Sequence, residues 1–325
     1  MQKGKTPYNV LKRSVLKHVA SRRREVLLEA GVGRSSSVLS CKEDGVFVIS
    51  ANPVVVSGAD ALYYGIFRCL NHLAASGAEP VGISDQILLP PSAQEGQLAD
   101  MMSQLNRVCA DLNIAILGGH TAVSEAVNLP VITLTAVGYG KKVPVKPEPG
   151  WDLVLTKYVG MEGTALLAWE KEELLHSHYT YDFLSGAKRM KAFLSVAAEA
   201  AVGASFGAAM HSLSEGGVLA ALWDMMDGAG LGMDVNLKSI PIRQETVEIT
   251  EFFELNPYQM LSGGSLLMAV PRGELLVRQL EQQKIPAVII GKTTDKKARI
   301  LRRDEEERYL DRPAMDELYR TGLLV

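Results

Sequence analysis

Residues 71–80 read Asn71-His72-Leu73-Ala74-Ala75-Ser76-Gly77-Ala78-Glu79-Pro80, and this stretch decides the fold assignment. It closes a helical stretch that runs from Ala59 to about Ser76. It leads into the apolar run Val81–Leu89, which is typical of a buried strand and is followed by two prolines. The stretch therefore predicts a helix that turns at Gly77 directly into a core strand.

Three further glycine-marked segments follow in the chain. Gly118-Gly119-His120-Thr121 ends a predicted short strand at Ile114–Leu117. His211-Ser212-Leu213-Ser214-Glu215-Gly216-Gly217-Val218 opens a predicted helix, and Ser262-Gly263-Gly264-Ser265 reads as a later turn. Between the first two segments, Ser92 is the expected N-cap of a helix running to Leu112.

In this order and spacing, the four segments resemble the aminoimidazole ribonucleotide synthetase superfamily, over about Gly31 to Gly291. That superfamily includes the hydrogenase-maturation dehydratase, selenophosphate synthetase and thiamine-monophosphate kinase. The sequence of these segments is most similar to that of relatives of the hydrogenase-maturation type. The resemblance implies a two-domain α/β (α+β) fold. Its N-terminal domain is β-rich and pairs in a dimeric barrel, and its C-terminal domain is α/β.

The length of the chain agrees with two domains, because 325 residues are many for a single core. The segment Lys141–Gly150 is rich in Lys, Pro and Gly and lacks periodicity, so it is the expected boundary. After it we expect a second α/β half, with strands at Leu153–Thr156, Ala208–His211, Met233–Val235, Leu266–Val270 and Ala287–Ile290, and with helices near Gly163–Leu175, Tyr181–Val202, Gly217–Asp227 and Gly273–Gln283. The predicted organisation is a basic N-terminal helix (1–30), an N-terminal domain (31–142), a C-terminal domain (151–303) and a charged tail (304–325).

Composition limits the classes of function. The chain has 47% hydrophobic and 22% charged residues and a formal net charge of −3, which is typical of a globular protein and does not indicate a nucleic-acid or membrane binder. It has no apolar run of about 18 residues and no secretory signal pattern. We expect a cytoplasmic protein.

The N-terminal segment Lys3–Arg24 holds eight basic residues and no acid, with apolar residues at helical spacing. The favoured interpretation is a solvated helix face packed on the first domain. The alternatives are a contact with an anionic ligand or a nucleic acid and, more remotely, an organelle transit peptide.

Members of the superfamily, as the resemblance implies, are ATP-using dimers that phosphorylate an oxygen of a substrate. Mg²⁺ on the polyphosphate needs hard oxygen ligands, mainly Asp and Glu. This chain has neutral residues where the family pattern has these acids: Ser35, Ser36, Asn52, His72, His120 and Ser212. The sequence therefore predicts that Mg²⁺ binding is degraded, while ATP remains a candidate cofactor.

The predicted cofactor-binding positions are those that match the family's loops: Ser35, Ser36, Asn52, Asn71, Gly118, Gly119, Thr121, Ser212, Gly216 and Gly217. The glycine pairs either cradle an anion through backbone N–H groups or serve only the fold. The catalytic candidates are His72, His120 and Glu125, and a transition metal held by His72 and His120 is a remote alternative. Cys41, Cys69 and Cys109 are interpreted as small core residues.

Three functions remain open at this point. The first is a non-catalytic or weakly active dimeric binding protein, with a nucleotide, small-molecule or protein partner. The second is an ATP-dependent enzyme that phosphorylates an amide or carboxylate oxygen of a small substrate through replacement ligands. The acids near the motif loops could supply these ligands, with Glu125 as the first candidate: Glu79, Asp85, Glu125, Glu162 and Glu215. The third is a small-molecule or anion binder that uses the inherited cleft and the basic N-terminal segment without chemistry.

Overall fold

A computed structural model describes residues 4–5, 8–19, 23–28, 38–39, 45–58, 60–142 and 144–324. The predicted site residues Ser35 and Ser36 lie outside this part of the chain, as does Cys41. The chain divides into two compact units: unit 1 is Met1–Leu73 with Ala78–Lys142, and unit 2 is Ala74–Gly77 with Val143–Val325. Among the described residues, no helix is both long and apolar enough to cross a membrane.

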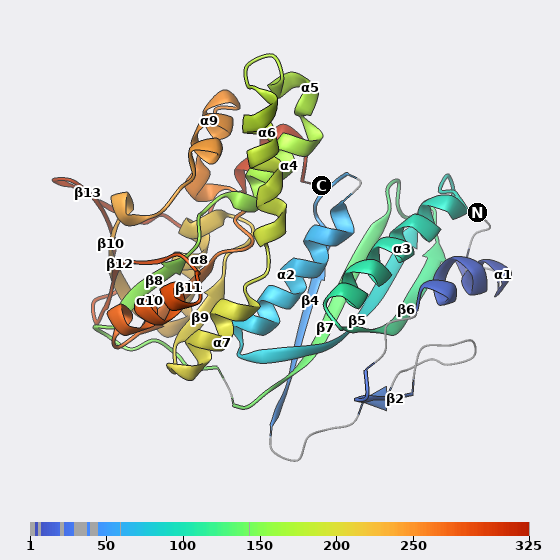
Figure 1. Ribbon diagram of the computed structural model, residues 1–325, viewed down its shortest axis with the longest axis horizontal. Coiled ribbons are helices and arrows are strands. Elements are labelled where there is room, and N and C mark those ends of the chain that lie inside the picture. The colour runs from blue at the N-terminus through green and yellow to red at the C-terminus, as the bar shows by residue number, and fades with distance from the viewer. Residues whose placement is uncertain are drawn as a thin grey trace. The chain divides into compact units, whose positions relative to one another are not determined.

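Unit 1 is built on a five-stranded sheet with the order β1-β6-β5-β7-β4 (Figure 1). Its strands are β1 (Gly4–Lys5), β4 (Val46–Pro53), β5 (Ala78–Leu89), β6 (Ala115–Val123) and β7 (Val131–Gly140). A separate short pair is formed by β2 (Val26–Leu28) and β3 (Val38–Leu39). Strand β5 pairs parallel with β6 and antiparallel with β7, so it is a central strand buried by both neighbours.

Helices α2 (Ala61–Ala75) and α3 (Glu95–Asp111) lie over the same face of this sheet (Figure 1). The apolar side of α3, with Leu98, Met102 and Leu105, is buried as predicted. The predicted cap Ser92 is wrong. Gln94 is the N-cap and forms a capping box with Gln97, because the amide oxygen of each side chain can accept from a free backbone N–H, as the oxygens of Ser and Glu do.

Strand β6 is longer than the predicted segment Ile114–Leu117, because it continues through Gly118-Gly119 to Val123. Gly118 has a φ of 112°, and the pairing with β5 shifts register between Ile83 and Ser84. The glycines therefore mark an irregularity inside a strand and not its end.

The N-terminal residues form a helical turn shorter than the predicted 1–30. It comprises α1 (Tyr8–Val10), a π-helical turn η1 (Leu11–Val15) and η2 (Leu16–His18). Val10 and Val15 are buried, and Arg13 pairs with Glu95 of α3. The contact with α3 supports the interpretation of a helix packed on the first domain. It lowers the pKa of Glu95 to about 2 through hydrogen bonds from Arg13 and Ser14.

Unit 2 is built on a seven-stranded sheet with the order β14-β13-β10-β12-β8-β11-β9. Its strands are β8 (Asp152–Thr156), β9 (Ala209–Ser212), β10 (Gly232–Asn236), β11 (Leu266–Val270), β12 (Ala287–Thr294), β13 (Arg299–Arg303) and β14 (Glu306–Tyr309). Its helices are α4 (Met161–Glu170), α5 (Glu172–Leu175), α6 (Tyr181–Arg189), η3 (Met190–Phe193), α7 (Ala197–Ser205), α8 (Gly217–Ala229), η4 (Leu237–Ser239), α9 (Gln244–Phe252), η5 (Pro257–Gln259), α10 (Gly273–Gln282) and η6 (Glu317–Thr321). The predicted mixed α+β class is confirmed.

Both faces of the central strands of this sheet are buried. Leu267 packs in the cluster that holds α8, whereas its neighbours Leu266 and Met268 pack with α7 and α10. Successive strand residues point to opposite faces, so an uninterrupted apolar strand such as β11 requires cover on both sides.

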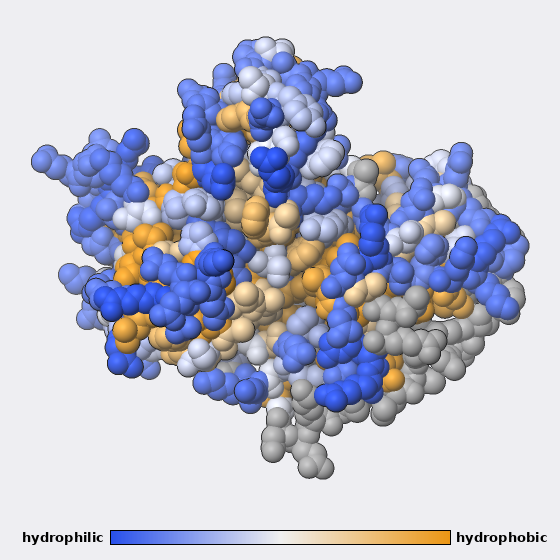
Figure 2. All heavy atoms as spheres, in the orientation of Figure 1, coloured by the Kyte–Doolittle hydropathy of each residue, from blue (hydrophilic) through white to orange (hydrophobic). Residues whose placement is uncertain are grey.

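Two parts of unit 2 differ from the sequence-based expectation. The predicted helix Tyr181–Val202 is interrupted at Leu194–Val196, and the predicted charged tail contains β14, which pairs antiparallel with β13. Every residue of β14 is exposed, and the surface over this hairpin is mostly hydrophilic (Figure 2). A fully solvated edge strand has no apolar alternation, so its sequence resembles a tail.

Candidate functional site

In unit 1, the structure brings two of the predicted site residues together. Asn52 lies near the end of β4 and His72 in the last turn of α2. Asn52 Nδ2 lies 3.2 Å from His72 Nδ1 and donates to Ser50 Oγ at 2.9 Å. This distance fits a hydrogen bond in which the Asn52 amide donates to an unprotonated Nδ1 of His72.

Cys69 completes this cluster from the middle of α2. Its Sγ lies 3.4 Å from Asn52 Nδ2 and 3.2 Å from the carbonyl oxygen of Leu134 on β7. The cluster Ser50, Asn52, Cys69 and His72 therefore consists of neutral groups that satisfy one another. Mg²⁺ prefers charged oxygen ligands, so this donor set does not fit that ion.

The second predicted loop, Gly118–Thr121, lies on β6, on the far side of the sheet from Asn52. The register joins Asn52 to Leu134, Leu134 to Asp85 and Asp85 to Gly119 in one row. Three strand spacings separate the ends of this row by about 14 Å. Asn71 lies beside His72 in α2 and is buried.

His120 and Thr121 point to opposite faces of the sheet. His120 pairs with Gln86, and both are exposed, whereas Thr121 pairs with Ile87, and both are buried. His72 is on the face covered by α2, so the fold does not bring His72 and His120 together. Glu125 is exposed in the loop after β6. In the described residues, no three His, Cys, Asp or Glu side chains form a group that could hold a metal.

Asp85 is a buried acid at the centre of this sheet, although the sequence indicates only that it is near the motif loops. Its side chain is 2% exposed, and burial raises its pKa to about 7. It also adds to burial in raising the pKa of the Cys109 thiol to about 12. Its position on β5 inside an apolar run is the signal that could have found it, because a lone acid in such a run is costly to ionise.

In unit 2, the predicted segment joins β9 to α8 through two glycines with left-handed φ angles, 78° at Gly216 and 66° at Gly217. A Cβ on Gly217 would lie 2.5 Å from the carbonyl oxygen of Tyr258, so this position requires glycine. Ser212 is 2% exposed, and its Oγ has no hydrogen-bond partner among the described residues.

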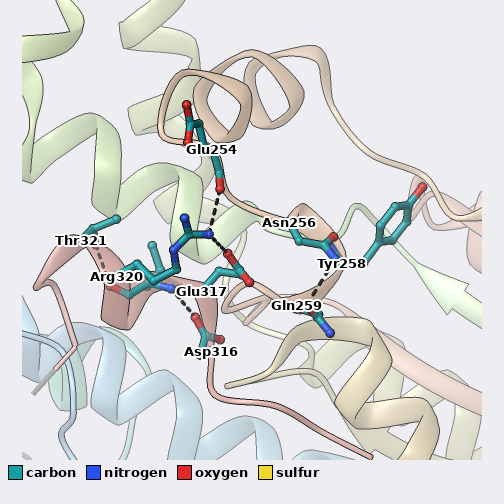
Figure 3. A network of polar contacts seen from close by, with 9 residues as sticks. Glu254, Asn256, Tyr258, Gln259, Asp316, Glu317, Arg320 and Thr321 are labelled. Carbon is teal, nitrogen blue, oxygen red and sulfur yellow. Dashed lines mark hydrogen bonds and ion pairs between the residues drawn. The ribbon is translucent and has the colours of Figure 1, made fainter. Parts of the chain in front are cut away.

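The backbone N–H of Gly216 already has a carboxylate partner. It donates to Asp316 Oδ2 at 2.7 Å. The other oxygen of Asp316, which Figure 3 labels, accepts from Leu318 N–H at 2.9 Å. Asp316 is 1% exposed. A carboxylate at the N-terminus of α8 complements the positive end of the helix dipole. Asp316 therefore occupies, from within the chain, the N–H group of Gly216 that was predicted to bind an anion.

The segment that carries Asp316 is held against unit 2. Arg320 donates to the carbonyl oxygen of Glu254 and to Glu317, each at 2.9 Å (Figure 3). Leu318, Leu323 and Leu324 are buried. This part of the predicted tail 304–325 therefore packs into the unit through Leu318, Leu323 and Leu324, whereas Met315 is exposed.

The later turn, Ser262–Ser265, forms hydrogen bonds with the start of α4 and with the residue before it. Ser262 Oγ accepts from Gly160 N–H at 2.8 Å, and Glu162 Oε2 accepts from Gly263 N–H at 2.9 Å. Glu162 is 2% exposed. Serine and glycine at these positions serve the close approach of two loops.

Family models and known proteins match nearly the whole chain. The model described as AIR synthase related protein, N-terminal domain, matches residues 34–139, and the model for the C-terminal domain matches residues 148–303. A hydrogenase expression/formation protein of Methanocaldococcus jannaschii is 23% identical, over 98% of this chain and 96% of the relative.

Solved structures have the same fold. The hydrogenase maturation protein HypE of E. coli is similar with a TM-score of 0.78 at 17% identity, over 97% of this chain and 99% of that one. A structure of HypE in complex with ATP is similar with a TM-score of 0.73 at 15% identity, over 95% of each chain.

Proposed function

Because the chain belongs to the AIR synthase related protein family, we propose that it is a dimeric, nucleotide-binding member in which phosphoryl transfer is weak or absent. The observation that carries this proposal is the 3.2 Å contact between Asn52 Nδ2 and His72 Nδ1. Two positions at which the family pattern has carboxylates hold neutral groups that are bonded to each other. A metal ligand set would instead present charged oxygens to the ion.

Two observations support binding of a nucleotide. A solved structure of similar fold is a complex with ATP. Ser212 Oγ, next to the glycine turn of α8, is buried with no partner among the described residues, and a buried hydroxyl gains when a ligand supplies one.

The open face of the sheet in unit 1 supports a dimer. Phe47, Ile49 and Val131 are 43%, 65% and 47% exposed on the face opposite α2 and α3. A sheet face with apolar side chains in water is stabilised by burial. We propose a second copy of this chain as its occupant, paired sheet to sheet.

The test is isothermal titration of the whole chain with ATP, with and without Mg²⁺, followed by a phosphate-release assay. We expect binding whose affinity changes less than about threefold with Mg²⁺, which corresponds to less than about 0.7 kcal/mol, and no turnover above background. Mg²⁺-dependent binding with turnover would favour the ATP-dependent enzyme, with Glu125 as the first residue to replace. Absence of binding in both conditions would overturn the nucleotide assignment.

Restored carboxylates sharpen the test. The double substitution Asn52→Asp/His72→Asp should make ATP binding about tenfold tighter with Mg²⁺ than without it, if ligand loss alone weakened the metal site. The matched control is Asn128→Asp/His176→Asp, at two exposed positions, one in each unit. Equal behaviour of the two double variants would count against the role of Asn52 and His72.

A further inference from the structure

Unit 2 contains a cavity of about 720 Å³. None of the site residues predicted from the sequence is part of its wall. Its walls come from four places: the loop from β8 to α4, the interrupted helix α6–η3–α7, the start of α9, and the turn between α10 and β12. A volume of this size lies within the range of small-molecule sites.

The charge of the cavity wall is unbalanced. Its cations are Lys157, Arg189, Arg243 and Lys284, and its carboxylates are Glu199 and Glu245. Four positive and two negative side chains leave two positive charges in excess. Each of the two carboxylates forms an ion pair with one cation, so the pairs show which cations remain.

Lys157 and Glu199 form the first of these pairs. Lys157 Nζ lies 2.6 Å from Glu199 Oε1 and also donates to the carbonyl oxygens of Phe193 and Ser195, at 3.0 and 2.7 Å. These carbonyls lie at the break between η3 and α7, where the helix leaves acceptors unpaired. All three donors of Lys157 are therefore used within the protein, and Lys157 holds the wall in place.

Arg243 and Glu245 form the second pair, with 3.2 Å between Nε and Oε2. The guanidinium of Arg243 also lies over the ring of Tyr158, 5.4 Å from its centroid. Arg189 and Lys284 remain. Within the described part of the chain, neither forms an ion pair within 4 Å. Arg189 NH1 donates to Ser185 Oγ at 3.0 Å, and its charge also helps to lower the pKa of Glu245.

The rest of the wall is apolar and partly aromatic: Tyr158, Met161, Met190, Phe193, Ile285 and Pro286. Phe193 is 55% exposed, so its ring is open to a ligand as well as to solvent. Apolar walls with a few charged groups are typical of sites that bury the ring of a ligand and hold its charge at one end.

The backbone fixes where two of the lysines stand in the wall. Lys284 has a φ of 61° at the position after the α10 C-cap, a left-handed conformation that Asn113 and Glu254 also adopt after their helices. Lys157 is also left-handed, with a φ of 52°, and its N–H donates to the carbonyl oxygen of Pro286 at 2.7 Å.

We propose that this cavity binds a small organic anion with a flat apolar part, its charge against Arg189 and Lys284 and its ring against Tyr158 and Phe193. The site is separate from the nucleotide site proposed above and does not depend on it. A guanidinium and an ammonium both suit a carboxylate or a phosphate monoester, and the experiment distinguishes the two.

The test uses 8-anilinonaphthalene-1-sulfonate as a fluorescent aromatic anion, with uncharged N-phenyl-1-naphthylamine as its matched probe. We expect one saturable class of sulfonate binding in the whole chain. The substitution Arg189→Gln/Lys284→Gln should weaken it about tenfold or more and change binding of the uncharged probe less than threefold. Benzoate and phenyl phosphate then compete with the probe, and the stronger competitor identifies the anion class.

The matched control is Arg278→Gln/Lys296→Gln, which removes two positive charges at exposed positions of unit 2 outside the cavity. It should leave the affinity within twofold. Lys284→Gly provides a variant that keeps the left-handed backbone without strain, so its thermal midpoint should not fall while sulfonate binding weakens. Equal losses in the cavity and control variants, or no loss in either, would overturn the proposal.

Discussion

A β-carbon placed on Gly119 would lie 2.0 Å from the backbone carbonyl oxygen of Asp85 and 2.7 Å from its Oδ1. The two residues are paired across β5 and β6, in the row that also contains Asn52. Glycine at position 119 therefore permits the close packing of β5 against β6, whether or not it also binds an anion. The carbonyl oxygen of Asp85 belongs to the backbone, so it cannot move aside as the end of a flexible side chain can.

We predict that Gly119→Ala lowers the free energy of unfolding by about 3 kcal/mol or prevents folding, because overpacking against backbone forces the strands apart. Urea unfolding followed by circular dichroism measures the change. Gly96→Ala on α3 is the control, since nothing lies within 4 Å of the place that its added methyl group would take, and it should be neutral or stabilising by about 0.5 kcal/mol. A fully stable Gly119→Ala protein would contradict the packing.

Asp85 should make the stability depend on pH. Its pKa in the folded chain is about 7, above the value of 3.8 for a free side chain, so the folded state favours the protonated form. Stability from this group is complete below about pH 4 and is lost as the pH rises toward and past 7. We predict that Asp85→Asn is more stable than the wild type by roughly 4 kcal/mol at pH 8 and nearly equal to it at pH 4.

The measurement is urea unfolding of both proteins at pH 4, 6 and 8. Only the difference between variant and wild type counts, because Glu95 and Glu25 have lowered pKa values and act in the opposite direction as the pH falls. Asp100→Asn on the exposed side of α3 should show no such trend. A difference that is constant with pH would argue against an ionisable, buried Asp85.

Glu199→Gln should destabilise the chain by about 3 kcal/mol, because it leaves the ammonium of Lys157 buried without its carboxylate. The pKa of Lys157 is already lowered by burial, against the raising effect of Glu199, and it should fall further. Thermal unfolding against Glu173→Gln, an exposed acid in α5, measures the effect. Equal stability of the two variants would mean that the pair is not desolvated.

Asp316→Ala should lower the free energy of unfolding by about 1–3 kcal/mol, since the N–H of Gly216 loses its acceptor and the start of α8 loses a compensating charge. Chemical unfolding compares it with Asp311→Ala, an exposed neighbour that should change stability by less than about 0.5 kcal/mol. Matching effects at the two positions would show that the Gly216 contact contributes little.

Ile49→Lys should convert the proposed dimer to a monomer, because it places a charge on the open sheet face. Light scattering after gel filtration gives the mass. Leu129→Lys is the control, as Leu129 is similarly exposed, at 62%, but lies in the loop before β7. An unchanged mass for Ile49→Lys would place any dimer interface elsewhere.

Local pattern predicted the elements with buried apolar runs. Strand β11 is the predicted Leu266–Val270, and α10 begins at the predicted Gly273. Helix α9 and strands β13 and β14 were not predicted, because their solvated faces carry so many charges that no apolar period is visible. Tertiary contacts also override local signals, as at the break before α7, whose free carbonyls are satisfied by Lys157.

For the candidate site, the resemblance placed Asn52 and His72 at related positions, and the structure shows that they touch. It could not indicate the separation of His72 from His120, which depends on the alternation along β6 and on where α2 packs. The cavity around Arg189 and Lys284 was not foreseen either, because its residues come from four distant segments with no common motif.

The order of synthesis gives the contact between Gly216 and Asp316 a further meaning. The carboxylate follows its N–H partner by 100 positions in the chain. At a translation rate of about 5–20 residues per second, the start of α8 exists for roughly 5–20 s before Asp316 has been made. During that interval the N–H of Gly216 lacks the acceptor that it has in the finished fold, so this contact can form only after nearly all of the chain has been made.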